Sequence, residues 1–84
     1  MVKLVTPDTL THALIRMGFS EVRSGAAGSH RLFRHGDSGL QVTVPNSGEL
    51  VRPVHLSAIR RQVSNFEIAS DDEFDRQLSR RRNG

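Results

Sequence analysis

Residues 29–45 have the sequence SHRLFRHGDSGLQVTVP, and this stretch decides the fold. Apolar and polar residues alternate from Leu40 to Val44, which is the pattern of a β-strand with one buried face. The four residues Gly36-Asp37-Ser38-Gly39 form a turn signal between that strand and residues 29–35. The stretch therefore predicts an antiparallel hairpin, whose second strand stops at Pro45.

The turn also fixes which residues face each other across this hairpin. A two-residue and a four-residue turn both place Phe33 opposite Val42 and Arg31 opposite Val44, with His35 opposite Leu40. The large apolar side chains then share one face, which we expect to be the buried one. The other, open face of the two strands holds His30, Leu32, Arg34, Gln41 and Thr43.

Helices are expected both before and after the hairpin along the chain. Residues 6–17 open with Thr-Pro-Asp, a helix start signal, carry an apolar stripe at helical spacing, and end before Gly18. A second helix is predicted over about 54–63. The capping-box sequence Ser-Asp-Asp-Glu at 70–73 begins a short third helix that carries Phe74 and Leu78.

A first strand is predicted over 20–24, between the first helix and the hairpin. If residues 25–28 form the loop that follows it, Val22 lies on the buried face and Arg23 lies opposite His30. The order is then helix, three antiparallel strands, helix. This predicts an α+β fold with both helices on one sheet face, the arrangement of double-stranded-RNA-binding domains (dsRBDs).

The length of 84 residues predicts a single domain over residues 1–84. Within it we expect a core over 6–66, an acidic helical appendage over 70–79 and a basic tail over 80–84. Residues 1–66 hold eight basic and four acidic residues, which fits a polyanionic partner such as nucleic acid. Plain solubility is the alternative explanation of this charge.

Composition excludes several other classes of function. The chain has no cysteine, and its four histidines do not follow a metal-ligand spacing, so we expect neither a metal site nor a cofactor. No apolar run approaches the roughly 20 residues of a membrane span, so we expect no membrane contact and a cytoplasmic location.

Residues 7–78 resemble the HicA toxin family of toxin–antitoxin pairs. The matching motifs are Met-Gly-Phe at 17–19, G-S-H-x-x-F-R-H at 28–35 and V-T-V-P at 42–45. The resemblance implies a dsRBD-like fold and a small, ribosome-independent mRNA interferase with one essential histidine, which maps onto His30. It also implies two partners, mRNA and a HicB-like antitoxin that blocks the toxin.

The residues around His30 suit this chemistry. RNA can be cut without a metal ion when a base activates the 2′-hydroxyl group and positive charges hold the phosphate. Histidine can be that base, or the acid, near neutral pH. We therefore predict His30 as catalytic, and we predict that the RNA phosphates contact Gly28, Ser29, Arg23, Arg34 and Arg31.

The sequence gives less reason to assign a catalytic role to His35 or His55. His35 lies five residues after His30, an odd offset that puts it on the opposite face, and a turn role suits it better. His55 begins the second helix, and nothing in the sequence places it near the site. Two alternatives to an enzyme stay open, a non-catalytic RNA-binding module and a protein-interaction domain of the same fold.

Overall fold

The computed structural model describes residues 5–22, 30–45 and 50–79, which form helices packed on a three-stranded antiparallel sheet. The predicted loop 25–28 and the basic tail 80–84 lie outside the described residues. In chain order the elements are α1 (Pro7–Arg16), β1 (Phe19–Val22), β2 (His30–His35), β3 (Gln41–Pro45), α2 (Pro53–Asn65) and α3 (Asp71–Ser79).

The start of α1 is stabilised as its sequence predicts. The backbone N–H of Thr9 donates to Oγ1 of Thr6 at 3.1 Å, so that Thr6 caps the helix. Pro7 occupies the first helical position, where its missing N–H costs nothing. The helix ends before Gly18, which has a φ angle of +101° and turns the chain into β1.

Two features disfavour any residue other than glycine at position 18, its backbone conformation and a neighbouring side chain. A Cβ atom at this position would lie 3.1 Å from Nε2 of His35, and the positive φ angle disfavours any L side chain. We expect Gly18→Ala to lower the free energy of unfolding by about 1–3 kcal/mol, measured by chemical denaturation. Gly36→Ala is the matched control, because a Cβ there meets nothing within 4 Å. Equal unfolding midpoints for the two variants would contradict this prediction.

The predicted hairpin and its register are confirmed. In the sheet order β1-β2-β3, Phe33 pairs with Val42 and Arg31 pairs with Val44. The backbone N–H of His35 donates to the carbonyl oxygen of Leu40 at 2.8 Å, which closes the turn. The expected apolar side chains of the hairpin are all buried: Phe33, Leu40, Val42 and Val44.

The predicted register of the first strand is wrong by one residue. Val22 pairs with Leu32, so it lies on the open face and not on the buried one. Phe19 pairs with His35 and is only 3% exposed, so Phe19 is the side chain that β1 adds to the core. Burial of Phe19 decides the register, because its phenyl group removes more apolar surface from water than the Val22 side chain does.

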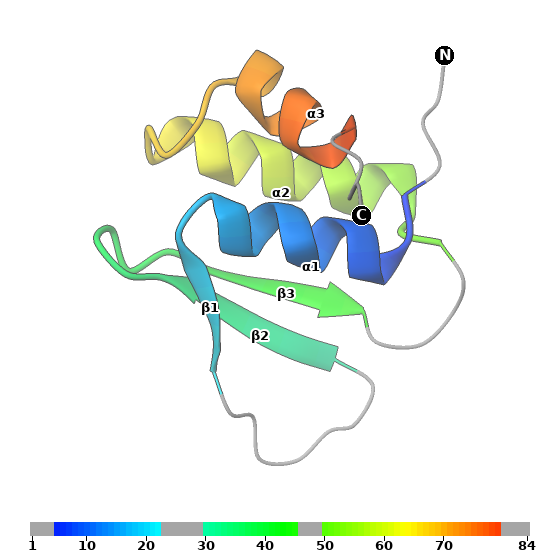
Figure 1. The fold of residues 1–84 in the computed structure, drawn as a ribbon, viewed down its shortest axis with the longest axis horizontal. Helices are drawn as coiled ribbons and strands as arrows, with labels where there is room; N and C mark the ends of the chain where they lie inside the picture. The colour runs from blue at the N-terminus through cyan, green and yellow to red at the C-terminus, as the bar shows by residue number, and fades with distance from the viewer. Residues whose placement is uncertain (1–4, 23–29, 46–49, 80–84) are drawn as a thin grey trace.

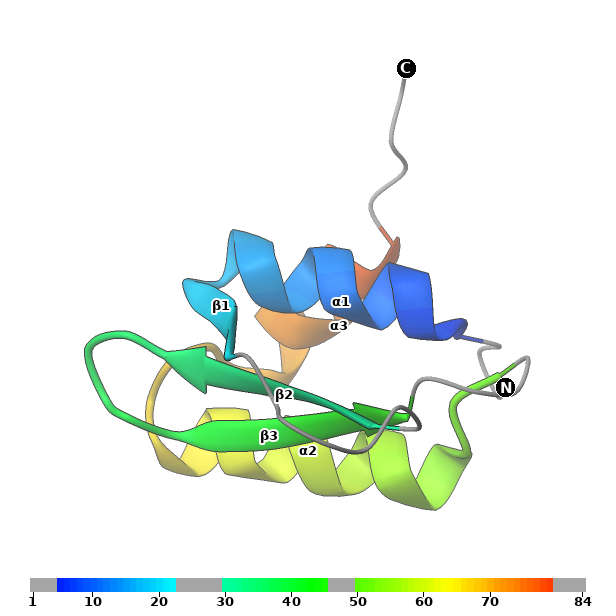
Figure 2. The same ribbon diagram turned by 90° about the horizontal axis from the view of Figure 1, so that it is seen from below.

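The helices form two layers on one side of the sheet. Figures 1 and 2 show α1 and α2 side by side over the same sheet face, with α3 on the far side of both helices. This confirms the α+β, dsRBD-like arrangement. Fully enclosed side chains come from all three layers: Val5, Leu10, Leu14, Phe33, Val44, Val63 and Phe74.

The third helix is anchored at both of its ends and in its middle. The N–H of Glu73 donates to Oγ of Ser70 at 3.1 Å, which confirms the predicted cap. Phe74 is fully buried, and Leu78 is nearly so. Near the C-terminus of α3, Arg16 of α1 donates to the Oε1 atom and to the main-chain oxygen of Gln77, at 2.8 and 2.7 Å. A second arginine, Arg60 of α2, pairs with Asp75 at 3.1 Å.

Candidate functional site

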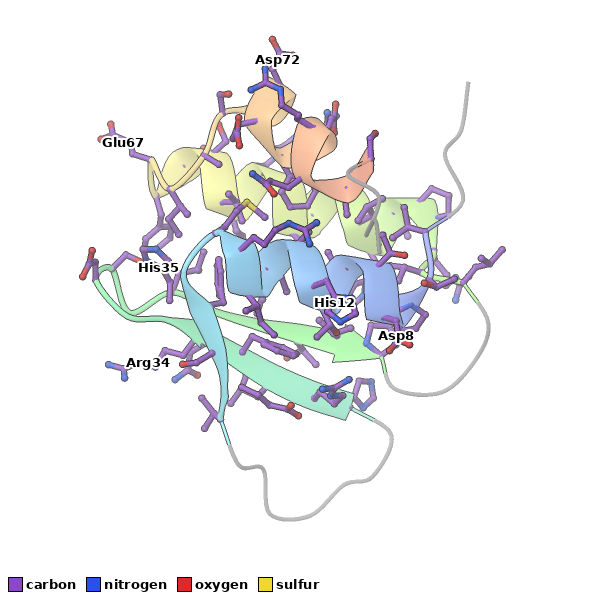
Figure 3. All side chains as sticks on the ribbon, in the orientation of Figure 1. Asp8, His12, Arg34, His35, Glu67 and Asp72 are labelled. Atoms are coloured by element: carbon purple, nitrogen blue, oxygen red, sulfur yellow. The ribbon has the colours of Figure 1, made fainter. Side chains whose placement is uncertain are left out.

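The open sheet face is the surface on which sequence reasoning placed the site. Two rows of paired residues cross the three strands, Ser20-Arg34-Gln41 and Val22-Leu32-Thr43, and His30 pairs with Pro45 beside them. Figure 3 shows Arg34 projecting away from the helices. Within the described part of this face, the paired positions include no carboxylate. The face is therefore polar and basic around a half-buried apolar centre of Val22 and Leu32.

His30 and Arg34 share this face but do not meet. Both side chains are exposed. They are four residues apart on β2, which corresponds to roughly 13 Å along a strand at about 3.3 Å per residue. This spacing along the backbone places Arg34 nearer to a phosphate that lies further along a bound strand.

Arg31 lies on the helix side of the sheet and is paired there. Its Nε and Nη2 atoms donate to the two carboxylate oxygens of Glu21, at 2.9 and 2.7 Å. The guanidinium carbon also lies 5.4 Å from the centre of the Phe33 ring. The hydrogen bonds to Glu21 raise the pKa of Arg31 above its ordinary value. Arg31 and His30 are thus neighbours in sequence that point to opposite faces.

This ion pair is expected to change the titration of Glu21. The hydrogen bonds from Arg31, more than any other contact, lower the pKa of the Glu21 carboxyl from its ordinary value. We expect the carboxyl resonance of Glu21, followed by NMR against pH, to titrate below the range of an unstructured glutamate. The pair stabilises the fold above the pKa of the unfolded state, and this stabilisation is lost as the pH falls through the folded-state pKa. An unchanged titration curve in Arg31→Gln would contradict the assignment.

The other predicted phosphate ligands, Arg23, Gly28 and Ser29, lie outside the described residues. In the part of the chain that the structure describes, no three side chains of His, Asp or Glu come close enough to hold a metal ion. The same residues include no helix long and apolar enough to cross a membrane. A shallow hollow on α2 and α3 is lined by Ser57, Arg60, Arg61, Ser64 and Asp71.

His35 has the turn role that its position predicts. The backbone N–H of Ser38 donates to Nδ1 of His35 at 3.2 Å, and Oγ of Ser38 lies 3.0 Å from the same nitrogen. The imidazole ring packs against Phe19, with the ring centres 5.2 Å apart. These contacts hold the turn between β2 and β3 against the start of β1.

His55 contacts the sheet, and no pattern in the sequence predicts this contact. Its Nε2 atom lies 2.9 Å from the main-chain oxygen of Thr43 on β3. A carbonyl oxygen only accepts hydrogen bonds, so Nε2 is the donor. Because the contact joins a side chain to the backbone of a distant strand, no sequence motif signals it.

Comparison with protein families places this chain in a known group. Residues 8–64 match the model of the HicA toxin of bacterial toxin–antitoxin systems. The match runs from α1 to the end of α2, includes His30 and leaves α3 outside. A comparison with curated protein sequences found no significant match. The family match covers more than half of the chain, and the chain therefore belongs to the HicA toxin family.

Proposed function

We propose that this toxin is an endoribonuclease that cleaves mRNA without a metal ion and that His30 is its catalytic residue. The observation that carries the proposal is the position of His30, exposed at the start of β2 on a face whose described paired positions include no carboxylate. A HicB-like antitoxin is the proposed protein partner, and the cytoplasm, where mRNA is translated, is the proposed location.

The proposed reaction uses a nucleophile that RNA itself carries. The 2′-oxygen attacks the adjacent phosphorus while a base takes its proton, and the 5′-oxygen then leaves. His30 is suited to move a proton at this phosphate, because imidazole exchanges protons near neutral pH. The products are a 2′,3′-cyclic phosphate and a 5′-hydroxyl end.

Positive charges on β2 and at the start of α2 support the binding of a phosphate backbone. Arg34 lies further along the same strand and suits a neighbouring phosphate. Arg52 is the N-cap of α2, a helix whose first turn contains no acidic residue, so the helix dipole adds to its charge. Arg31 is held by Glu21 on the opposite face, and because that ion pair has no net charge it adds little to the positive potential of the open face.

A second candidate function is supported by the apolar centre of the same face. Val22 and Leu32 are paired and half-buried, and a partly apolar surface suits contact with another protein. A non-catalytic domain that only bound protein or RNA would use this face without a chemical step.

An assay in which purified toxin is incubated with transcribed RNA in the presence of EDTA distinguishes between these functions. We expect internal cuts with 2′,3′-cyclic phosphate and 5′-hydroxyl ends, and we expect addition of the antitoxin to stop the cleavage. RNA that is bound in a salt-dependent manner but stays intact would support the binding module instead. RNA that is neither cut nor bound would overturn the proposal.

A further inference from the structure

Three different side chains follow one another along the open face of β2. His30, Leu32 and Arg34 occupy alternate positions of the strand, so they share one face. At about 3.3 Å per residue, each lies roughly 7 Å from the next along the backbone. Along the strand, a group that exchanges protons is followed by an apolar group and then by a cation. RNA that lies along β2 can therefore place a phosphate at His30, a neighbouring base at Leu32 and a further phosphate near Arg34.

Leu32 is the centre of a row that crosses all three strands. It pairs with Val22 of β1 on one side and with Thr43 of β3 on the other. Directly opposed side chains on neighbouring strands lie about 5 Å apart, so the three side chains are in contact range of each other across the row. Val22 and Leu32 are half-buried, and Thr43 is exposed. We call this row the base platform, because apolar side chains of this kind can support the flat face of a nucleotide base.

The size and the charge of this face favour RNA over a protein as the occupant of the base platform. A stable protein interface buries about 800 Å² on each partner, whereas the apolar part of this row consists of Val22 and Leu32 with one methyl group of Thr43. Arg34 is exposed beside the row, and the described paired positions of the face include no carboxylate. A small apolar centre on a basic face is complementary to a polyanion that carries flat apolar groups.

The RNA that fits this face is single-stranded. In a duplex each base is stacked on its neighbours and paired, so its flat face is not available to a protein. All three described helices lie on the other side of the sheet, as Figures 1 and 2 show, so they do not cover the base platform. An unpaired base can therefore approach Leu32 while its backbone follows β2.

Thr43 adds a polar group at the rim of the base platform. Its hydroxyl group can both donate and accept a hydrogen bond, as the edge of a base requires. The backbone of Thr43 is held in place by His55 of α2, whose Nε2 atom donates to the Thr43 carbonyl oxygen at 2.9 Å. A hydroxyl group on a fixed backbone can distinguish between bases, because a base with no matching edge group leaves it without a partner.

We propose that Val22, Leu32 and Thr43 form the subsite for one unpaired base beside the cleaved phosphate, and that Thr43 selects which base binds there. This inference rests on the proposed function and specifies its substrate as single-stranded RNA. Leu32 and Val22 contact the face of the base, and the Thr43 hydroxyl contacts its edge. His30 remains the residue that acts on the phosphate.

The first test compares Leu32→Ala with the wild type on a set of RNA oligonucleotides. In each of them one nucleotide near the cut lacks its base. At one position we expect the missing base to lower kcat/KM of the wild type by about 10-fold, the scale of one base contact. We expect Leu32→Ala to lose about as much on intact RNA and nothing further on that abasic RNA, because the contact is already absent.

The second test concerns the choice of base. The wild type and Thr43→Val are incubated with RNA of random sequence, and the new ends are sequenced. We expect the wild type to prefer certain bases at the position found in the first test, and Thr43→Val to lose that preference while it continues to cut. Ser57→Ala removes an exposed hydroxyl group on α2 and is expected to keep the wild-type preference. An unchanged preference in Thr43→Val overturns the selecting role of Thr43.

Further variants separate this inference from folding and from the proposed function. Leu32→Phe offers a larger flat surface and is expected to lower KM on intact RNA but not on the abasic RNA, which a damaged fold would not produce. Ile15→Ala replaces a side chain on α1 that is 51% exposed and should keep the wild-type kcat/KM. If Leu32→Ala and base removal have additive effects at every position, or if duplex RNA is cut as fast as single-stranded RNA, the base platform is refuted even if His30 is essential. A wild-type protein that leaves RNA intact overturns the proposed function and this inference with it.

Discussion

His30→Ala is expected to slow RNA cleavage by the purified toxin by at least about 10²-fold, the usual contribution of one general acid or base. The variant retains the sheet and its charges but has no group at that position that can exchange a proton. The rate is measured on a defined RNA with EDTA present, over a range of pH. In bacteria, we expect induction of the wild-type chain to arrest growth and induction of His30→Ala to have no such effect.

This variant is a clean test because His30 is exposed at the end of a strand. Exposed substitutions away from special features usually change stability by less than about 0.5 kcal/mol, so the unfolding midpoint should stay near that of the wild type. His12→Ala serves as the control for loss of an exposed histidine and should remain toxic. Wild-type cleavage by a folded His30→Ala protein would refute the catalytic assignment.

Among the substitutions predicted here, Phe74→Ala is expected to give the largest loss of stability. Removal of a fully buried phenyl group costs about 3–5 kcal/mol, a large part of the 5–15 kcal/mol that stabilises a typical domain. We expect the variant to be largely unfolded at 37 °C, as measured by circular dichroism and urea denaturation. Phe66→Ala is the matched control, because the Phe66 ring is 49% exposed.

The result bears on whether α3 belongs to the folding unit. This helix lies outside the segment that matches the family, and its ion pair between Arg60 and Asp75 is partly exposed. Exposed pairs contribute little, so the burial of Phe74 and Leu78 must supply most of the docking energy. If the NMR spectrum of α1 and α2 is unchanged in Phe74→Ala, α3 is a separable addition and this interpretation is wrong.

The hairpin of β2 and β3 could be predicted in detail because its turn is short. A Gly-Asp-Ser-Gly turn leaves little choice of register, so the partners of Phe33 and Arg31 follow from sequence alone. The first strand has no such constraint. Phe19 and Val22 are both apolar, and the choice between them depends on packing against α1, which local patterns do not contain.

The sequence predicted which sheet face each site residue occupies, but not which side chains contact each other. Strand alternation correctly put His30 and Arg34 on one side and Arg31 on the other. The pairing of Arg31 with Glu21 requires the register of β1, and the contact of His55 with Thr43 requires the docking of α2. Both depend on tertiary structure, so neither could be derived from the spacing of residues along the chain.

The hydrogen bonds between Arg16 and Gln77 have a consequence for protein synthesis. They join residues that are 61 positions apart, and the buried Phe74 lies beside them in sequence. During translation, α1, the sheet and α2 emerge first, but their shared core stays open until α3 has also left the ribosome. A nascent toxin therefore exposes its apolar helix surfaces until residue 79 is free, which gives an antitoxin or a chaperone time to meet the chain before it is fully folded.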